Sequence, residues 1–191
     1  MSKVYAIRRS VQPYFRELEL DVMDIARYSP DDVSLDDVTR FSELNTSMAG
    51  WWEPIVTNFY DEPDDKDKDI PEICPWVGGT LILSPKAFRL LKDSVKGCGE
   101  FLPIKVGPEE YQIFNCLSLG DDDLAASDVE HDGDLALWVN GLVTAPVNDK
   151  QLVFKSPLEK GVTLFCTDRF KAVVESFGLK GLYFDEALIE V

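Results

Sequence analysis

The stretch WVGGTLILSPKAFRLLKDSVKG, residues 76–97, contains the clearest structural signal in the chain. Its apolar run predicts a strand that ends at Ser84, a residue type that commonly caps a helix N-terminus. Pro85 then occupies the first helical position, which suits its fixed φ and missing N–H. The glycine at the end of the stretch predicts the helix end. The following KAFRLLKDSV spaces its apolar residues at the helical period, which puts on one face Phe88, Leu91 and Val95.

The same order of signals returns near the C-terminus, in VTLFCTDRFKAVVESFG, residues 162–178. A strand leads to a hydroxyl cap at Thr167, a short amphipathic helix and a glycine, and GLYFDEA then predicts another strand. The likeness to residues 76–97 fits an internal duplication, but two strand-helix-strand passages also look alike by chance, so the sequence leaves both explanations open. The inward face of this helix is expected to hold Phe170, Val173, Val174 and Phe177.

Further strand signals fill the rest of the chain. FLPIKV and YQIFNCLSL, joined by a turn at Gly107 and Pro108, predict a hairpin, and QLVFK predicts another strand. Near the N-terminus, residues 3–8 and 14–22 are expected to form a second hairpin, whereas SPDDVSLDDVTRFSEL contains helix or turn starts at Ser29 and Ser34. The stretch LALWVNGLV alternates as a strand, with one face formed by Leu135, Leu137 and Val139.

These elements predict an α+β fold, a mostly antiparallel sheet with a few short amphipathic helices. A chain of 191 residues with 45% hydrophobic residues is sufficient for a real core. The acidic run DEPDDKDKDIPE, residues 61–72, is expected to be a loop. We assign residues 1–72 to an N-terminal part that ends in this acidic loop and residues 73–191 to an α+β domain, with one continuous domain as the alternative.

The chain carries a formal net charge of −16, from 35 acidic and 19 basic side chains. Two stretches hold most of the excess, because residues 61–72 have a net charge of −5 and residues 121–134 a net charge of −7. Such a field repels nucleic-acid phosphates and anionic lipid, so neither is expected as a partner. Charge runs usually keep a protein soluble, and their other use is to attract a basic partner.

Composition also gives expectations about location and cofactors. The N-terminus lacks the apolar core of a signal peptide, and no run approaches the roughly 20 apolar residues of a membrane span, so a cytoplasmic location is expected. With no C-x-x-C pair and a single histidine, the cysteines form no zinc motif, and no metal or other cofactor is expected. Buried, reduced thiols are expected for Cys74, Cys98, Cys116 and Cys166.

The stretch GDDDLAASDVEHDGDLALWVNG, residues 120–141, contains seven acids, the only histidine and no Lys or Arg. It approaches the spacing of a calcium loop, but Glu130 stands where Asp or Asn is needed and Val139 where a bidentate Glu should close the coordination sphere. The acids can orient His131, yet no Ser or Cys nucleophile stands at a recognisable spacing from it, so an exposed turn histidine is expected. No hydrolase, phosphate-loop or dinucleotide motif occurs in the sequence, and we predict no enzyme activity and no catalytic residue.

A protein docking face fits residues 120–141 best. Carboxylates attract a basic partner at long range, and aromatic side chains can anchor it. Trp76 and Trp138 are expected in the core, which favours the adjacent tryptophans at positions 51 and 52 as anchors. The predicted partner-binding residues are Asp121, Asp122, Asp123, Asp128, Glu130, Asp132, Asp134, Trp51 and Trp52.

The C-terminal half also resembles a known family. The order LILSPKAFRLL, EFLPIKV, YQIFNCLS followed by an acidic run, LVFKS, LFCTDRFKAVVES and GLKGLYF lies within residues 76–184. This order is similar to that of a family of bacterial immunity proteins of polymorphic toxin systems, named after a myxobacterial immunity protein. The shared motifs are patterns of strand and helix with a G-L-x-F-like ending, here Gly181 to Phe184, and they contain no catalytic signature.

The resemblance implies a non-enzymatic antidote, a cytoplasmic protein that binds a cognate toxin, usually encoded by a neighbouring gene, and blocks its active site or its folding. An acidic surface suits that role, because a toxin that acts on nucleic acid or membrane is often basic. We therefore predict an immunity protein that neutralises its toxin through an acidic surface. The alternative is an intracellular hydrolase or metal-binding protein that uses the acidic turn at residues 128–134.

Overall fold

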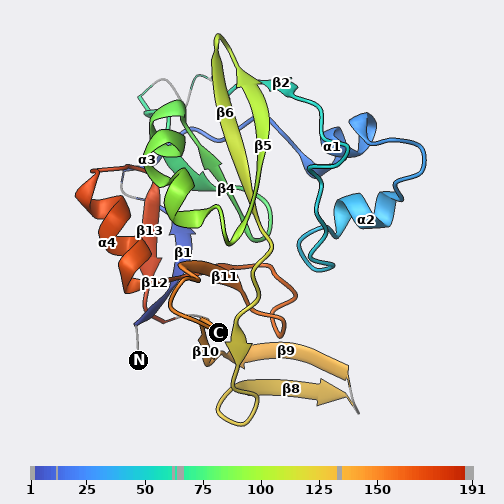
Figure 1. Ribbon diagram of the computed structural model, residues 1–191, viewed down its shortest axis with the longest axis vertical. Helices are drawn as coiled ribbons and strands as arrows, with labels where there is room; N and C mark the ends of the chain where they lie inside the picture. The colour runs from blue at the N-terminus through green and yellow to red at the C-terminus, as the bar shows by residue number, and fades with distance from the viewer. Residues whose placement is uncertain (1–2, 12, 62, 64–66, 133–134, 188–191) are drawn as a thin grey trace.

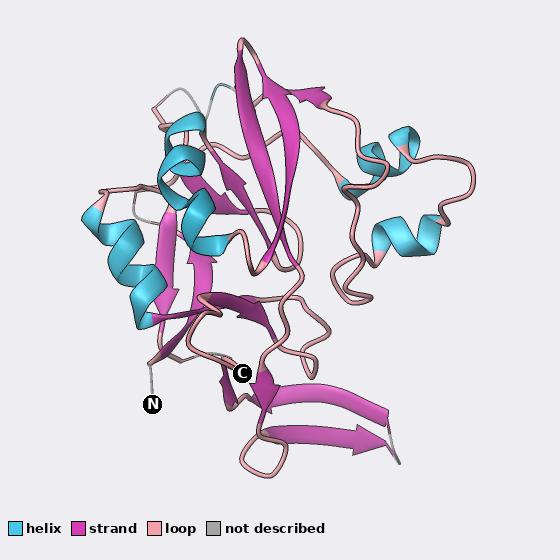
Figure 2. Cartoon of the chain, in the orientation of Figure 1, coloured by secondary structure: helices cyan, strands magenta, loops and turns pink. Residues whose placement is uncertain are grey.

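The computed structural model describes residues 3–11, 13–61, 63, 67–132 and 135–187, without the side chains of residues 131–137. Within these ranges the chain forms four helices and thirteen strands (Figure 1, Figure 2). All but one of the strand pairs found there are antiparallel. The predicted α+β class is therefore confirmed.

The larger sheet has five strands in the order β2–β5–β6–β4–β3. Their bounds are Ile55–Thr57 for β2, Ile73–Pro75 for β3, Thr80–Leu83 for β4, Gly99–Val106 for β5 and Glu109–Cys116 for β6. β5 and β6 form the predicted hairpin, and its turn contains Gly107 with a φ of 56°, a conformation that glycine adopts without a Cβ clash. β2 runs parallel to β5.

The smaller sheet has the order β11–β12–β1–β13, and its strands are all antiparallel to their neighbours. Their bounds are Val4–Arg9 for β1, Val153–Lys155 for β11, Leu164–Thr167 for β12 and Leu182–Asp185 for β13. The predicted hairpin between residues 3–8 and 14–22 is wrong, since residues 14–21 form only isolated bridges and Val22 begins a helix. The physical reason is that β1 buries Tyr5 and Ile7 on one face and Ala6 on the other, so it needs a central position in a sheet.

The two longer helices form as predicted. α3 (Pro85–Val95) begins with Ser84 Oγ accepting a hydrogen bond from the Ala87 N–H, and α4 (Asp168–Ser176) follows Thr167, which makes no such bond. α1 (Val22–Tyr28) and α2 (Leu35–Thr39) are shorter. The expected helix start at Ser34 is confirmed, whereas Ser29 ends α1 and is followed by a turn, which the Val33 N–H closes on the Pro30 carbonyl.

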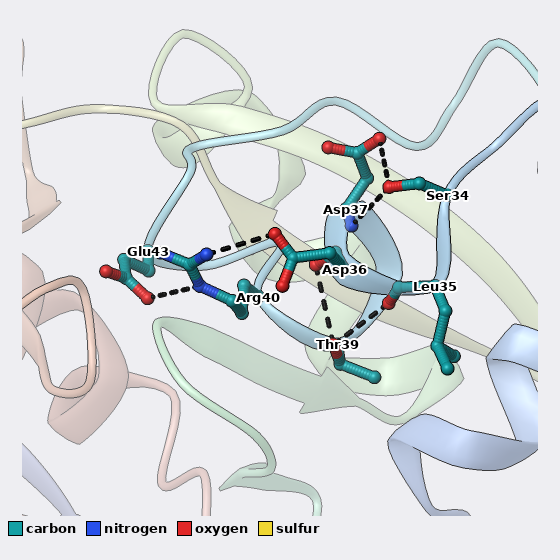
Figure 3. A network of polar contacts seen from close by, with 7 residues as sticks. All are labelled: Ser34, Leu35, Asp36, Asp37, Thr39, Arg40 and Glu43. Atoms are coloured by element: carbon teal, nitrogen blue, oxygen red, sulfur yellow. Dashed lines mark hydrogen bonds and ion pairs between the residues drawn. The ribbon is translucent and has the colours of Figure 1, made fainter.

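Polar contacts hold both ends of α2, as Figure 3 shows. Ser34 Oγ accepts from the Asp37 N–H at 3.0 Å and donates to its carboxylate at 2.7 Å. At the other end, the Arg40 guanidinium forms ion pairs with Asp36 at 3.0 Å and Glu43 at 2.9 Å. These exposed ion pairs contribute little to stability, but they partly neutralise the charges of Asp36 and Glu43 within the chain.

The two sheets repeat one arrangement. In the larger sheet, β4, α3 and β5 form a strand-helix-strand unit whose two parallel strands flank the antiparallel β6, with β3 outside β4. In the smaller sheet, β12, α4 and β13 form the same unit around β1, with β11 outside β12. This agreement of strand order and direction favours duplication over chance. The two arrangements differ at two points: β6 follows β5 directly whereas β1 comes from the N-terminus, and β2, which pairs with β5, has no counterpart in the smaller sheet.

Three clusters of buried residues form the core. The first lies between the sheets and the helices α3 and α4, which run side by side in Figure 1. The second lies on the other face of the larger sheet, under α1 and α2. The third, on the other face of the smaller sheet, contains Ala6, Leu142, Phe154 and Phe165. All four cysteines are buried and unbonded, which confirms the expectation of buried thiols.

Candidate docking surface

The chain between β6 and β11 forms a two-stranded ribbon that projects from the two sheets (Figure 1). Its strands are β8 (Asp128–Asp132) and β9 (Leu135–Gly141), which run antiparallel. Within the described residues, β8 and β9 make extensive contacts only with one another. The ribbon is therefore a separate element that projects from the two sheets (Figure 1).

The base of the ribbon is fixed to the smaller sheet. β7 (Asp121–Asp122) pairs with β10 (Thr144–Ala145), and the Asp123 N–H donates to the Val143 carbonyl at 2.9 Å. Val139 and Leu142 contribute apolar side chains to the third core cluster. The segment thus has a structured root, and the ribbon projects beyond it (Figure 1).

Two of the predicted acids have structural roles within the chain. The half-buried Asp122 carboxylate accepts hydrogen bonds from Ser156 Oγ at 2.8 Å and the Leu158 N–H at 2.9 Å. The Asp123 carboxylate accepts from the N–H groups of Ala125 and Ala126, at 3.0 and 3.1 Å, and so holds the turn before β8. Their partner-binding role stays a prediction, but each has a reason to be present without a partner.

The remaining described acids of this stretch face solvent. Asp121, Asp128 and Glu130 are exposed, and no ion pair in the described part of the chain neutralises them. We call these three residues the acidic set. Asp132 lies in β8, but its side chain, like that of His131, is outside the description, and Asp134 is outside the described residues altogether.

Trp138 lies on the ribbon, and the expectation that it sits in the core is wrong. Its surface is 68% exposed, and it stands directly opposite Glu130 in the β8–β9 pairing. The physical reason is the alternation of β9, because Val139 points toward the third core cluster and its neighbour Trp138 points away from it. Sequence reasoning missed this residue although the same alternation was visible in LALWVNGLV.

Trp51 and Trp52 lie elsewhere, packed against the second core cluster on the larger sheet. Their rings are 6.1 Å apart, and Trp52 Nε1 donates to the Pro103 carbonyl at 2.9 Å. Trp76 packs against the same cluster, and its Nε1 donates to the Leu20 carbonyl at 2.8 Å. The half-buried Trp51 and Trp52 are thus engaged within the chain, and the structure does not bring them together with the acidic set.

The geometry of the ribbon suits binding better than catalysis. Catalytic sites are usually concave, whereas Asp128, Glu130 and Trp138 lie on the projecting ribbon and Asp121 lies at its base (Figure 1). Among the described residues, no group of three His, Cys, Asp or Glu side chains is placed to hold a metal ion. None of the helices in the described ranges is long and apolar enough to cross a membrane. No protein-family model matches the chain, and no curated protein matches it either.

Proposed function

We propose that this protein binds and neutralises a basic protein toxin through the ribbon and the acidic set. One observation carries the proposal. Residues 117–149 contain eight acids and no Lys or Arg, and the fold raises the middle of this segment as a projecting ribbon. The resemblance to bacterial immunity proteins supports the antidote role, and the charge supports a basic partner.

The charge distribution favours fast association with such a partner. Exposed carboxylates without cations beside them produce a negative potential around the ribbon, and a complementary potential raises association rates at low salt. The acidic set has no described role within the fold, unlike Asp122 and Asp123. Carboxylates that a fold does not use can be retained for binding at little cost in stability.

Growth of cells that express the reading frame beside this gene tests the proposal. Expression of that frame alone should stop growth, and co-expression of the wild-type protein should restore it. The variant Asp121→Asn/Asp128→Asn/Glu130→Gln should protect less well, because it removes the charges that attract the toxin.

A matched control carries the same change in net charge at exposed acids of the N-terminal part, Asp31→Asn/Asp32→Asn/Glu53→Gln. This control should protect as well as the wild type does. If the product of the neighbouring reading frame is harmless, or if it kills cells that also express the wild-type protein, the antidote role is contradicted. If both variants lose protection equally, the ribbon is not part of the interface.

A further inference from the structure

Trp138 is the largest apolar side chain of the ribbon that the structure describes, and it is 68% exposed. Single exposed aliphatic residues are common on proteins and need no explanation. A tryptophan is different, because burial of its large, rigid apolar surface in an interface stabilises the complex substantially. An exposed tryptophan therefore favours association with a partner that covers it. The other three tryptophans are half-buried and packed against the second core cluster.

The ribbon holds this tryptophan in a defined direction. The pairing of β8 with β9 is irregular between Asp128 and Val129 and again between Glu130 and His131, so the Glu130–Trp138 pair lies between two irregularities. Such bulges twist a strand and redirect its side chains. A two-stranded ribbon is marginally stable alone in water, so an occupant that packs against it would also stabilise it.

The surroundings of Trp138 define the chemistry of that occupant. Residues that face each other across an antiparallel pair have Cβ atoms about 5 Å apart, which places the Glu130 carboxylate beside the indole. Asp128 lies exposed in the same strand, and the nearest basic residues along the chain are outside residues 117–149. Nucleic acid, anionic lipid and a second copy of the same acidic ribbon would all be repelled.

We propose that Trp138 is the anchor of the docking surface, and that its occupant is a protein with an apolar, indole-sized pocket rimmed by Lys or Arg side chains. The inference rests on the proposed function and adds a division of roles. The acidic set attracts the partner and sets the association rate, whereas the buried indole holds it and sets the dissociation rate.

Binding kinetics separate these two roles. The probe is the purified product of the neighbouring reading frame, immobilised and titrated with this protein at low and high salt. Trp138→Ala should raise the dissociation rate about 30-fold, as expected of an interface hot spot, with an association rate near that of the wild type. Trp138→Phe should recover part of the loss. Asp128→Asn/Glu130→Gln should lower the association rate and its salt dependence while changing dissociation little.

Val56→Ala is the matched control, since Val56 is 71% exposed on β2 of the larger sheet and should not affect binding. If the wild type binds and Trp138→Ala dissociates at the wild-type rate, the anchor is wrong and the proposed function stands. If the wild type does not bind the probe, both proposals fall. If light scattering shows that the isolated protein forms a dimer that Trp138→Ala dissociates, the occupant is a second copy and the basic partner is wrong.

Discussion

Replacing Lys155 with methionine should make the protein more stable at neutral pH, and the gain should shrink as the pH rises. Lys155 lies in β11 with none of its surface exposed, and its Nζ donates to the Ser42 carbonyl at 2.8 Å. Within the described residues no carboxylate forms an ion pair with it. Burial therefore disfavours the charged form and lowers the pKa of Lys155 from its ordinary value of 10.5 to about 8.

The pKa difference fixes the sign and the size of the effect. Because the pKa is lower in the folded state, the unfolded chain binds the proton more tightly, and the wild-type free energy of unfolding rises with pH between about 8 and 10.5. The full difference corresponds to about 3 kcal/mol, of which about 1.3 kcal/mol falls between pH 7 and pH 9. Methionine has a similar length and no proton to lose.

The lost hydrogen bond offsets part of the gain. Its removal costs about 1 kcal/mol. The Ser42 carbonyl is not left alone, because it also accepts from the Asn45 N–H at 3.4 Å. At pH 7 we therefore expect Lys155→Met to be more stable than the wild type by about 1–2 kcal/mol.

Urea unfolding at pH 7, 8 and 9, followed by tryptophan fluorescence in the presence of a reductant, measures this difference. Burial also raises the pKa of the Cys74 thiol to about 12, which lowers stability as the pH rises above about 9, but both proteins share this effect. Lys105→Met, at an exposed lysine of β5, is the control and should follow the wild-type pH dependence. A difference between wild type and Lys155→Met that stays constant from pH 7 to pH 9 would refute a buried lysine that titrates.

Three further predictions concern packing and burial. Gly79→Ala should destabilise the fold by about 2 kcal/mol, because the added Cβ would stand 2.2 Å from Lys155 Cδ. In a double-mutant cycle, Lys155→Ala should remove much of that cost, and additive effects of the two substitutions would contradict the clash. Glu100→Ala should cost about 2–3 kcal/mol in urea unfolding, since its carboxylate accepts from the N–H groups of Met48 and Ala49 and from Asn115 Nδ2, whereas the exposed Glu109→Ala should be near neutral. The four cysteines should react with a thiol reagent only when the protein unfolds, because all are buried; rapid modification of any of them in the native protein would contradict that placement.

Local signals in the sequence predicted the elements that depend on neighbouring residues. Ser84 and Pro85 marked the start of α3, and Gly107 with Pro108 marked the turn between β5 and β6. The pairing of β1 could not be predicted, because its partners β12 and β13 lie at the opposite end of the chain. No residue near Val4–Arg9 indicates that these two strands are its partners. Strand pairing over such a separation depends on the whole fold.

The case of Trp138 shows a different limit. The alternation in LALWVNGLV placed Trp138 on the opposite face to Val139, and the structure has that arrangement. The sequence did not indicate which face of β9 the rest of the fold would cover. That depends on the position of β9 in a ribbon outside both sheets. Large aromatic residues are usually buried, and this general preference led to the wrong expectation.

The place of the ribbon in the repeated architecture explains how it can carry such a surface. Each unit consists of two parallel strands, a helix and a central antiparallel strand, and the two units share the first core cluster. The segment with β7 to β10 lies in the chain between β6 and β11. Among the described residues from β7 to β10, Leu142 alone is a buried member of a core cluster. Changes beyond this root therefore leave the packing of both sheets intact. Acids and an exposed tryptophan can gather there because the packing of the two sheets does not depend on them.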